Sequence, residues 1–239
     1  MLALESMGEN GVLKGGKPTG TERVADSMRE RILAGEFRAG APLREEELTA
    51  SYNVSRHVVR EVLRKLAGEG FAEYSSFKGA RIPLLDPDEV ADIYRARQFV
   101  ECGSLASAGR RIDVHELAAI HGHFANAVAE NDWNAAFDWD LRFHSCIVST
   151  TGSYRLDAWH KGLLLSLKLA HLAAPEFQNL GLERSVPQHA EVVIALAAKD
   201  VSRASVALRR HLADSECVLL DGLRQRLRDN HKLGSGTDL

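Results

Sequence analysis

The chain has 239 residues, a formal net charge of −3, 45% hydrophobic residues and 26% charged residues, which suits a globular protein of one large or two modest domains. No apolar run approaches the roughly 18 residues that span a bilayer, and the first 20 residues lack the apolar stretch of a secretion signal. Three widely spaced cysteines without a CxxC pair argue against a disulfide scaffold. We therefore expect a cytoplasmic protein with free thiols and no membrane contact.

The first structural segment predicts two helices after a lead-in. Residues 1–20 are rich in glycine and polar residues and are expected to be disordered. Apolar residues at helical spacing predict a helix over 22–34, with Thr21 as its N-cap. Glycines and a proline then break the chain before a second, short helix over about 44–51.

A third helix and a hairpin complete this domain. A tight connection at 52–54 leads to a helix that Ser55 is expected to cap and that Gly68 and Gly70 are expected to end. The stretch 71–84 then predicts two short strands around a turn at 76–79. Helix, helix–turn–helix and β-wing in this order indicate a winged helix–turn–helix domain over residues 21–84.

The remainder of the chain predicts an all-helical domain over residues 86–229. Asp86-Pro87-Asp88-Glu89 combines an N-cap, a proline at the first helical position and a capping glutamate. Six helical segments follow without a convincing strand, at about 88–110, 114–130, 132–149, 153–173, 184–199 and 201–228, and Asp200 is expected to begin the last of them. The longest break is expected at 175–181, and 230–239 is expected to be a flexible tail. Short connections favour an antiparallel bundle, so the predicted fold class is mainly α.

Basic residues on the helix from Ser55 point to double-stranded DNA as a partner. Arg56 and Arg60 lie four residues apart on one face, and His57 stands beside them at the end that normally enters the major groove. Arginine contacts guanine in bidentate fashion, and Ser55 at the helix N-terminus suits a phosphate. The alternative is a solvated basic face on an ordinary helix. The charge balance of residues 21–83, with 11 Lys/Arg against 10 Asp/Glu, does not by itself indicate nucleic acid.

Four residues in the helical domain suggest a metal site. Asp140 and His144 are four apart and project from one face of a helix. His189 follows Pro187 near the start of a later helix, and His211 lies in the last one. Three imidazoles and one carboxylate are ligands that a divalent metal such as zinc or nickel selects. The alternative is that Asp140 and His144 form only a surface pair.

The stretch PLREEELTASYNVSRHVVREVLRKLAGEGF resembles the N-terminal signature of GntR-type bacterial transcription regulators. The resemblance implies DNA contacts from Arg44, Ser55, Arg56, Arg60 and the wing glycine Gly79. His57 stands where the branch usually has threonine, which bears on the choice of operator.

The resemblance covers about residues 21–228. YRARQFVECGSLAS and DWDLRFH resemble motifs of the FCD effector domain of the FadR-like branch. This likeness implies an all-helical, metal-binding domain with Asp140, His144, His189 and His211 as ligands, in a homodimer.

We therefore expect a homodimeric, ligand-responsive transcription regulator, with repression as the expected direction. An octahedral metal with four protein ligands leaves two positions for a small organic acid. Arg97 is expected to clamp a further carboxylate of that effector, unless it only forms an exposed pair with Glu101, and His171 is expected to line the pocket.

Two alternatives remain for the metal. One is a metal-dependent hydrolase, but no general base is clearly placed and the DNA module would lack a purpose, so we expect no enzyme. The other is a regulator whose metal is structural or is itself the signal.

Overall fold

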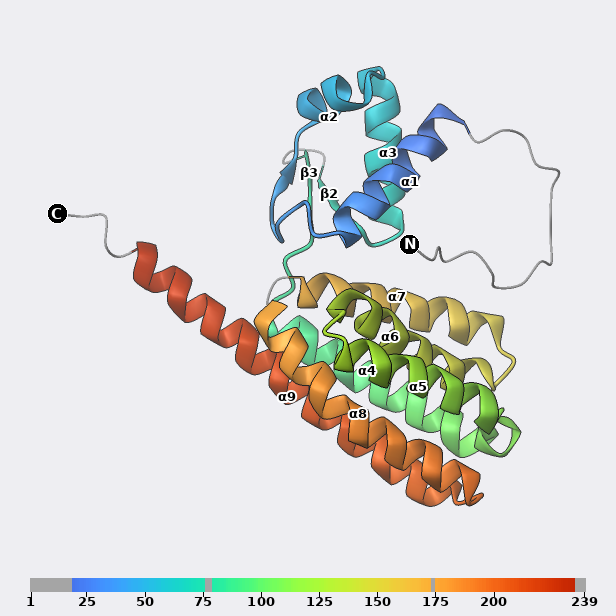
Figure 1. Ribbon diagram of the computed structural model, residues 1–239. Helices are drawn as coiled ribbons and strands as arrows, with labels where there is room; N and C mark the ends of the chain where they lie inside the picture. Colours follow the sequence, from blue (N-terminus) through green and yellow to red (C-terminus); the bar gives the residue numbers. More distant parts are fainter. Residues whose placement is uncertain (1–18, 76–78, 173–174, 235–239) are drawn as a thin grey trace.

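The computed structural model describes residues 19–75, 79–172 and 175–234, with only the backbone of 175–178 and 229–234. The chain forms a small N-terminal domain that rests on a larger helical domain (Figure 1). The N-terminal domain contains, in order, α1 (Gly20–Leu33), β1 (Pro42–Leu43), α2 (Glu45–Tyr52), α3 (Arg56–Gly68), β2 (Glu73–Ser75) and β3 (Gly79–Arg81). This order confirms the winged helix–turn–helix fold.

Local capping explains where these helices begin. Thr19, and not Thr21 as predicted, caps α1, because its side chain and that of Glu22 form a reciprocal capping box. Asn53 ends α2 in a left-handed conformation with φ of 50°, which makes the tight turn before α3. Ser55 caps α3 by accepting a hydrogen bond from the Val58 amide at 3.4 Å.

The wing is a small antiparallel sheet with the strand order β1-β3-β2. Two of these strands are the predicted pair, and β1 is an addition: Pro42 pairs with Arg81 and Leu43 with Ala80. A strand of two residues is too short to show an alternation of apolar and polar residues, so it could not be predicted from the sequence. It forms because β3 is there to pair with it. Of the turn predicted at 76–79, residues 76–78 lie outside the described residues.

The helical domain follows the predicted order with six α-helices among the described residues. They are α4 (Pro87–Ala108), α5 (Val114–Ala129), α6 (Trp133–Ser149), α7 (Tyr154–His171), α8 (Pro175–Ala197) and α9 (Val201–Gly234), with a 3-10 turn η1 (Gly109–Arg111) after α4. Aspartates cap several of them as expected: Asp86 begins α4 with a capping box, and Asp200 precedes α9 and accepts from the Arg203 amide. The fold class is mainly helical.

Two boundary predictions were wrong. The break expected at 175–181 is the first part of α8, and Pro187 lies inside that helix. Pro187 has no N–H to donate to the Glu183 carbonyl, a local cost that the packing of α8 along α9 and α5 offsets. His189 is therefore in the interior of a long helix. The last helix runs to Gly234, beyond the predicted end near 228, so the segment expected to be a tail begins as helix.

The buried apolar residues form three clusters, one in the N-terminal domain and two in the helical domain. The first cluster also takes in Leu169 of α7, which is 3% exposed, so the two domains share a packed contact. Within the described residues, no helix is long and apolar enough to cross a membrane.

Candidate metal centre and DNA-binding face

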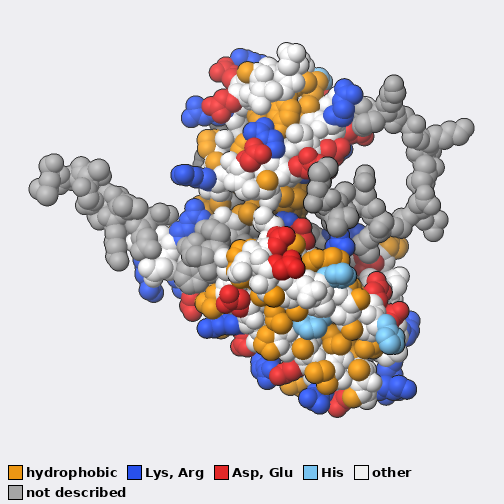
Figure 2. All heavy atoms as spheres, in the orientation of Figure 1, with side chains coloured by type: hydrophobic (Ala, Val, Ile, Leu, Met, Phe, Trp, Pro, Cys, Tyr) orange, Lys and Arg blue, Asp and Glu red, His pale blue; other side chains and the backbone are white. Residues whose placement is uncertain are grey.

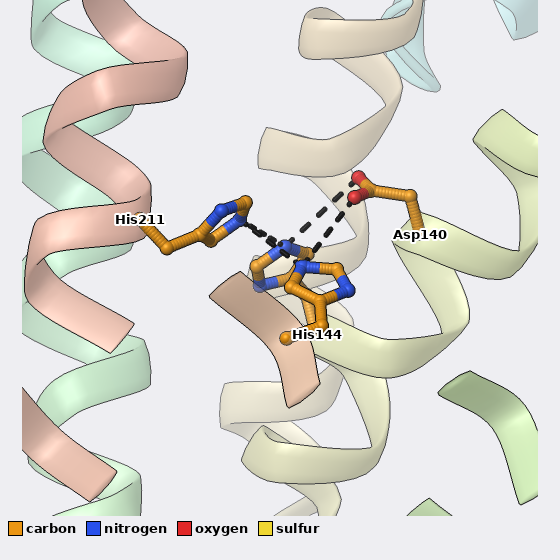
Figure 3. Close-up of side chains that lie close together, drawn as sticks. Asp140, His144 and His211 are labelled. Atoms are coloured by element: carbon orange, nitrogen blue, oxygen red, sulfur yellow. Dashed lines mark hydrogen bonds and ion pairs between the residues drawn. The ribbon is translucent and has the colours of Figure 1, made fainter. Parts of the chain in front are cut away.

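The four predicted metal ligands converge inside the helical domain. Asp140 and His144 come from α6, His189 from α8 and His211 from α9, and one ligand atom of each lies within 4.8 Å of the others. His211 Nε2 is 3.1 Å from His144 Nε2 (Figure 3). It is also 3.2 Å from His189 Nε2. Residues that are far apart in the sequence thus present their ligand atoms to one point.

Burial holds the cluster in place. His144 and His189 are fully buried, and His211 and Asp140 are 2% and 7% exposed. The ring of Phe143 stacks on that of His189 with centroids 3.9 Å apart. The side chains are therefore fixed by packing as well as by their own contacts, which excludes the alternative of a surface pair.

Hydrogen bonds assign the protons of two imidazoles. Glu101 Oε2 lies 2.6 Å from His144 Nδ1, and a carboxylate can only accept, so His144 carries its proton on Nδ1. Gln188 donates its amide to Asp214 at 2.7 Å, which turns its Oε1 toward His211 Nδ1 at 2.9 Å. His211 therefore also carries its proton on Nδ1.

This arrangement leaves the Nε2 lone pairs of His144 and His211 facing each other at 3.1 Å with no proton between them. Two lone pairs at that distance repel, and a cation between them removes the repulsion. Nitrogens that bind one Zn²⁺ at about 2.0–2.1 Å lie roughly 3 Å apart, so the spacing suits a shared ion. The residues present fit a divalent metal.

The charge states of the buried histidines also suit a divalent metal. Burial, together with the neighbouring histidines, lowers the pKa of His189 and of His211 well below the usual value, so both rings are neutral at neutral pH. Neutral imidazole is the form that binds metal. Burial raises the pKa of Asp140, while His144 and Arg97 oppose the rise.

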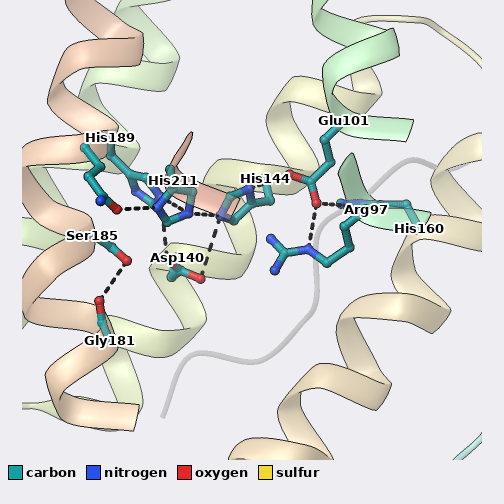
Figure 4. Close-up of polar contacts among 10 residues, drawn as sticks. Arg97, Glu101, Asp140, His144, His160, Gly181, Ser185, His189 and His211 are labelled. Carbon is teal, nitrogen blue, oxygen red and sulfur yellow. Dashed lines mark hydrogen bonds and ion pairs between the residues drawn. The ribbon is translucent and has the colours of Figure 1, made fainter. Parts of the chain in front are cut away.

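A buried network surrounds the cluster (Figure 4). Glu101 Oε1 accepts from Arg97 Nε at 2.8 Å and lies 3.0 Å from His160 Nε2. Burial alone would raise the pKa of Glu101, but the positive charge of Arg97 and the contact with His144 lower it by more than burial raises it. The pKa is therefore well below its usual range, and the group is a carboxylate. Arg97 is 1% exposed, so the exposed ion pair considered from the sequence was wrong.

A small cavity of about 20 Å³ adjoins the cluster. Its lining includes Arg97, Asp140, His171, Ser185 and His211. Arg97 Nη2 is buried without a hydrogen-bond partner among the described residues. An unpaired guanidinium nitrogen beside a cavity is a ready site for an anionic oxygen.

Three residues of this network were not identified from the sequence. Glu101 was noted only as a partner of Arg97, and neither His160 nor Gln188 was assigned a role in the site. Gln188 precedes the candidate ligand His189 on α8, and Glu101 follows Arg97 by one turn on α4. Both residues are neighbours of positions that the sequence singled out, but their contacts with His144 and His211 depend on how the helices pack.

Glu101→Gln is expected to lower the affinity for Zn²⁺ about 10–100-fold, because an outer carboxylate orients the ligand imidazole and increases its basicity. Competition with a fluorescent chelator measures the change. Glu191→Gln is the control, since Glu191 lies on the same helix as His189 but makes an exposed pair with Arg210. Equal affinities for the two variants would contradict the role of Glu101.

The metal-free protein is expected to lose stability as the pH falls from 6.5 toward 4. Burial lowers the pKa of His171 from 6.5 to about 4, and the pKa values of His189 and His211 are lowered in the same direction. Between these limits the unfolded chain binds protons that the folded chain does not, so stability falls by about 1.4 kcal/mol per pH unit per proton. Urea unfolding in chelator at pH 7, 6 and 5 tests this, and pH-independent midpoints would contradict it.

The residues predicted to contact DNA lie on the exposed side of the N-terminal domain. The side chains of Arg44, Arg56, His57 and Arg60 are 69%, 62%, 82% and 54% exposed. Arg56 and Arg60 come from the N-terminal part of α3, which the cap at Ser55 begins. Gly79 begins β3 with φ of 75°, a conformation that favours glycine in the wing.

Acidic side chains accompany this basic face. Arg56 pairs with Glu46 at 2.8 Å and Arg60 with Glu45 at 2.9 Å, both from α2. Figure 2 shows basic and acidic side chains next to one another on the visible face of this domain. Exposed pairs of this kind contribute at most about 1 kcal/mol, so phosphates and bases can compete for the arginines.

Comparisons with known proteins agree with the fold. Residues 20–82 match the model of the bacterial regulatory proteins of the gntR family, and residues 92–214 match the FCD domain. A gluconate operon transcriptional repressor of Bacillus licheniformis is 30% identical over 185 residues, covering 74% of this chain and 76% of that protein. The repressor GlaR of Escherichia coli K12 is 28% identical over 202 residues, covering 77% and 89%.

A crystal structure of a GntR regulator from Rhodococcus sp. RHA1 has a TM-score of 0.75 at 26% identity and covers 84% of this chain and 97% of its own. These relatives are transcription regulators, so the hydrolase alternative is set aside. The chain belongs to the GntR family of bacterial transcription regulators, in the FadR-like branch that carries a C-terminal FCD domain.

Proposed function

We propose that this protein is a repressor whose helical domain binds a divalent metal and a small organic acid, and whose winged domain binds operator DNA in response. The observation that carries the proposal is the buried cluster of Asp140, His144, His189 and His211. It lies beside a cavity lined in part by Arg97, whose Nη2 has no hydrogen-bond partner among the described residues. Two of the relatives are named as repressors, which supports the direction of regulation.

The metal is zinc or nickel, held by the carboxylate of Asp140 and Nε2 of the three histidines. When bound, it supplies a Lewis acid with coordination positions beyond those of the protein. Glu101 and Gln188 fix the tautomers of His144 and His211, so these rings present lone pairs to the ion without rearrangement.

The effector is a small carboxylate, with Arg97 and His171 as its contacts outside the metal. Arg97 Nη2 offers a charge-assisted hydrogen bond, and both residues line the cavity. The cavity of about 20 Å³ has room for about one or two water molecules, so a hydroxy acid must displace side chains to enter. A ligand that binds one side-chain arrangement better than another shifts the population, which is what a response requires.

The DNA partner is a duplex operator that Arg44, Ser55, Arg56, His57, Arg60 and Gly79 contact. A homodimer presents two such domains to two half-sites. Large apolar side chains are exposed on the paired helices α4 and α7, with Phe99 at 85%, Tyr154 at 72% and Trp159 at 52%, and they offer surface for a second copy. Light scattering after gel filtration tests the dimer. We place the protein in the cytoplasm, where its DNA lies.

A regulator with a structural metal is the competing proposal. The cavity beside Asp140 and the unpaired Arg97 Nη2 favour an effector. A metal that only stabilised the fold would not need a neighbouring cavity in which an anion can bind.

Thermal unfolding against a panel of small carboxylates, with Zn²⁺ or Ni²⁺ added and after chelation, tests the proposal. Gluconate belongs in the panel because of the Bacillus relative. One acid that raises the melting temperature only with metal present supports the effector site, and the same acid must then change the affinity for a duplex selected from a random pool. Stabilisation by metal with every acid silent would leave the metal structural.

A further inference from the structure

Helix α7 has two faces that serve different domains. Leu165, Leu169 and Leu172 follow one another at helical spacing and pack into the apolar cluster of the N-terminal domain. Leu167 and His171, on another face, line the cavity beside the metal cluster. Figure 1 shows α7 along the side of the helical domain that faces the N-terminal domain.

The outer face of α7 meets the ends of two helices that position the DNA-binding face. A Cβ at Gly70, directly after the turn that ends α3, would lie 3.7 Å from Leu165 Cδ2. A Cβ at Gly35, after α1, would lie 3.7 Å from Leu172 Cδ2. The helix that carries Arg56 and Arg60 therefore rests, through its C-terminal end, on α7.

The inner face of α7 is joined to the metal cluster by hydrogen bonds. His160 is 1% exposed, and its Nε2 lies 3.0 Å from Glu101 Oε1, while Glu101 Oε2 holds His144 Nδ1 at 2.6 Å. Arg97 shares the same Glu101 oxygen as His160. A shift of His144 or Arg97 therefore moves the Glu101 carboxylate, and with it the contact from Glu101 to His160 on α7.

We propose that α7 couples the metal and effector site to the DNA-binding domain, and that His160 is the positioning residue that makes the link. The inference rests on the proposed metal site. Packed helices move as units because close-packed interiors deform little, so a shift at His160 is carried to Leu165, Leu169 and Leu172. Coupling of this kind requires two states that both sites bias.

Amide hydrogen exchange of the full chain, in chelator and in saturating Zn²⁺, tests the coupling. Metal analysis of each sample measures occupancy separately. In the wild type, Zn²⁺ is expected to slow exchange several-fold in α7 and in the segments around Gly35 and Gly70, as well as in the helices that carry the ligands. In His160→Leu with Zn²⁺ bound, the slowing should persist around His189 and His211 but disappear around Gly35 and Gly70.

Two further variants separate positioning from general stability. His160→Gln keeps an N–H that reaches Glu101 and should restore at least half of the slowing in the winged domain. Leu169→Ala changes only the outer face and should break the coupling without altering Zn²⁺ affinity. Leu196→Ala is the matched control, since Leu196 is also a buried leucine but lies in a cluster without residues of α7 or of the winged domain.

The outcomes distinguish this inference from the proposed metal site. Bound Zn²⁺ with unchanged exchange around Gly35 and Gly70 in the wild type would overturn the coupling and leave the metal site standing. Slowing in His160→Leu and Leu169→Ala equal to that in the wild type would do the same. A wild-type chain that binds no Zn²⁺ would overturn both.

Discussion

His189→Ala and His211→Ala are each expected to lower the affinity for Zn²⁺ by more than 100-fold. Each change removes a ligand nitrogen itself, whereas loss of an outer partner typically costs about 10–100-fold. The three remaining groups stay buried, but they no longer enclose the ion. His211 Nε2 lies within 3.2 Å of both other imidazoles, so the loss of one ring leaves a gap beside the other two. Isothermal titration with Zn²⁺ measures the loss directly.

The same variants should lose the stabilisation that metal gives the wild type. At 100 times its Kd, a ligand that binds only the folded state stabilises it by about 2.7 kcal/mol. His115→Ala is the control, because His115 is exposed on α5 and outside the cluster. Wild-type titration curves for His189→Ala and His211→Ala would remove these residues from the site.

Local signals in the sequence predicted most of the helix starts and the order of the domains. Asp86, Asp200 and Ser55 act as caps where the sequence indicated them, because capping depends on atoms within three residues. Pro175, Gly181 and Pro187 also give local signals, and here they were misleading. Leu182 is 4% exposed and a Cβ at Gly181 would lie 3.6 Å from Val218 of α9, so burial against α9 keeps this segment helical.

In the candidate metal site, too, local signals were predictable from the sequence and contacts between distant helices were not. Asp140 and His144 share a helical face that spacing alone reveals, but their approach to His189 and His211 is a property of how α6, α8 and α9 pack. Glu101 contacts His144 across 43 residues and His160 across 59. No periodicity encodes such contacts, so the partner that fixes His144 could not be predicted before the helices were placed.

The second large effect is expected in DNA binding. Arg56→Ala and Arg60→Ala should each weaken binding to a selected duplex by about 1–3 kcal/mol, roughly 5- to 150-fold, if they make bidentate base contacts. Fluorescence anisotropy at one fixed salt concentration measures the affinities. Arg210→Ala is the control, since Arg210 is an exposed arginine on α9 paired with Glu191.

Changes at the acidic partners of these arginines are expected to have the opposite effect. In the free protein Glu46 holds Arg56, and Glu45 holds Arg60 through both carboxylate oxygens at 3.0 and 2.9 Å. DNA must compete with these glutamates, and their negative charges also oppose the phosphates. Glu46→Gln should therefore tighten binding a few-fold, because the exposed pair contributes at most about 1 kcal/mol. Weaker binding by Glu46→Gln would mean that Glu46 orients Arg56 for the base, and unchanged binding by Arg60→Ala would place the recognition surface elsewhere on the domain.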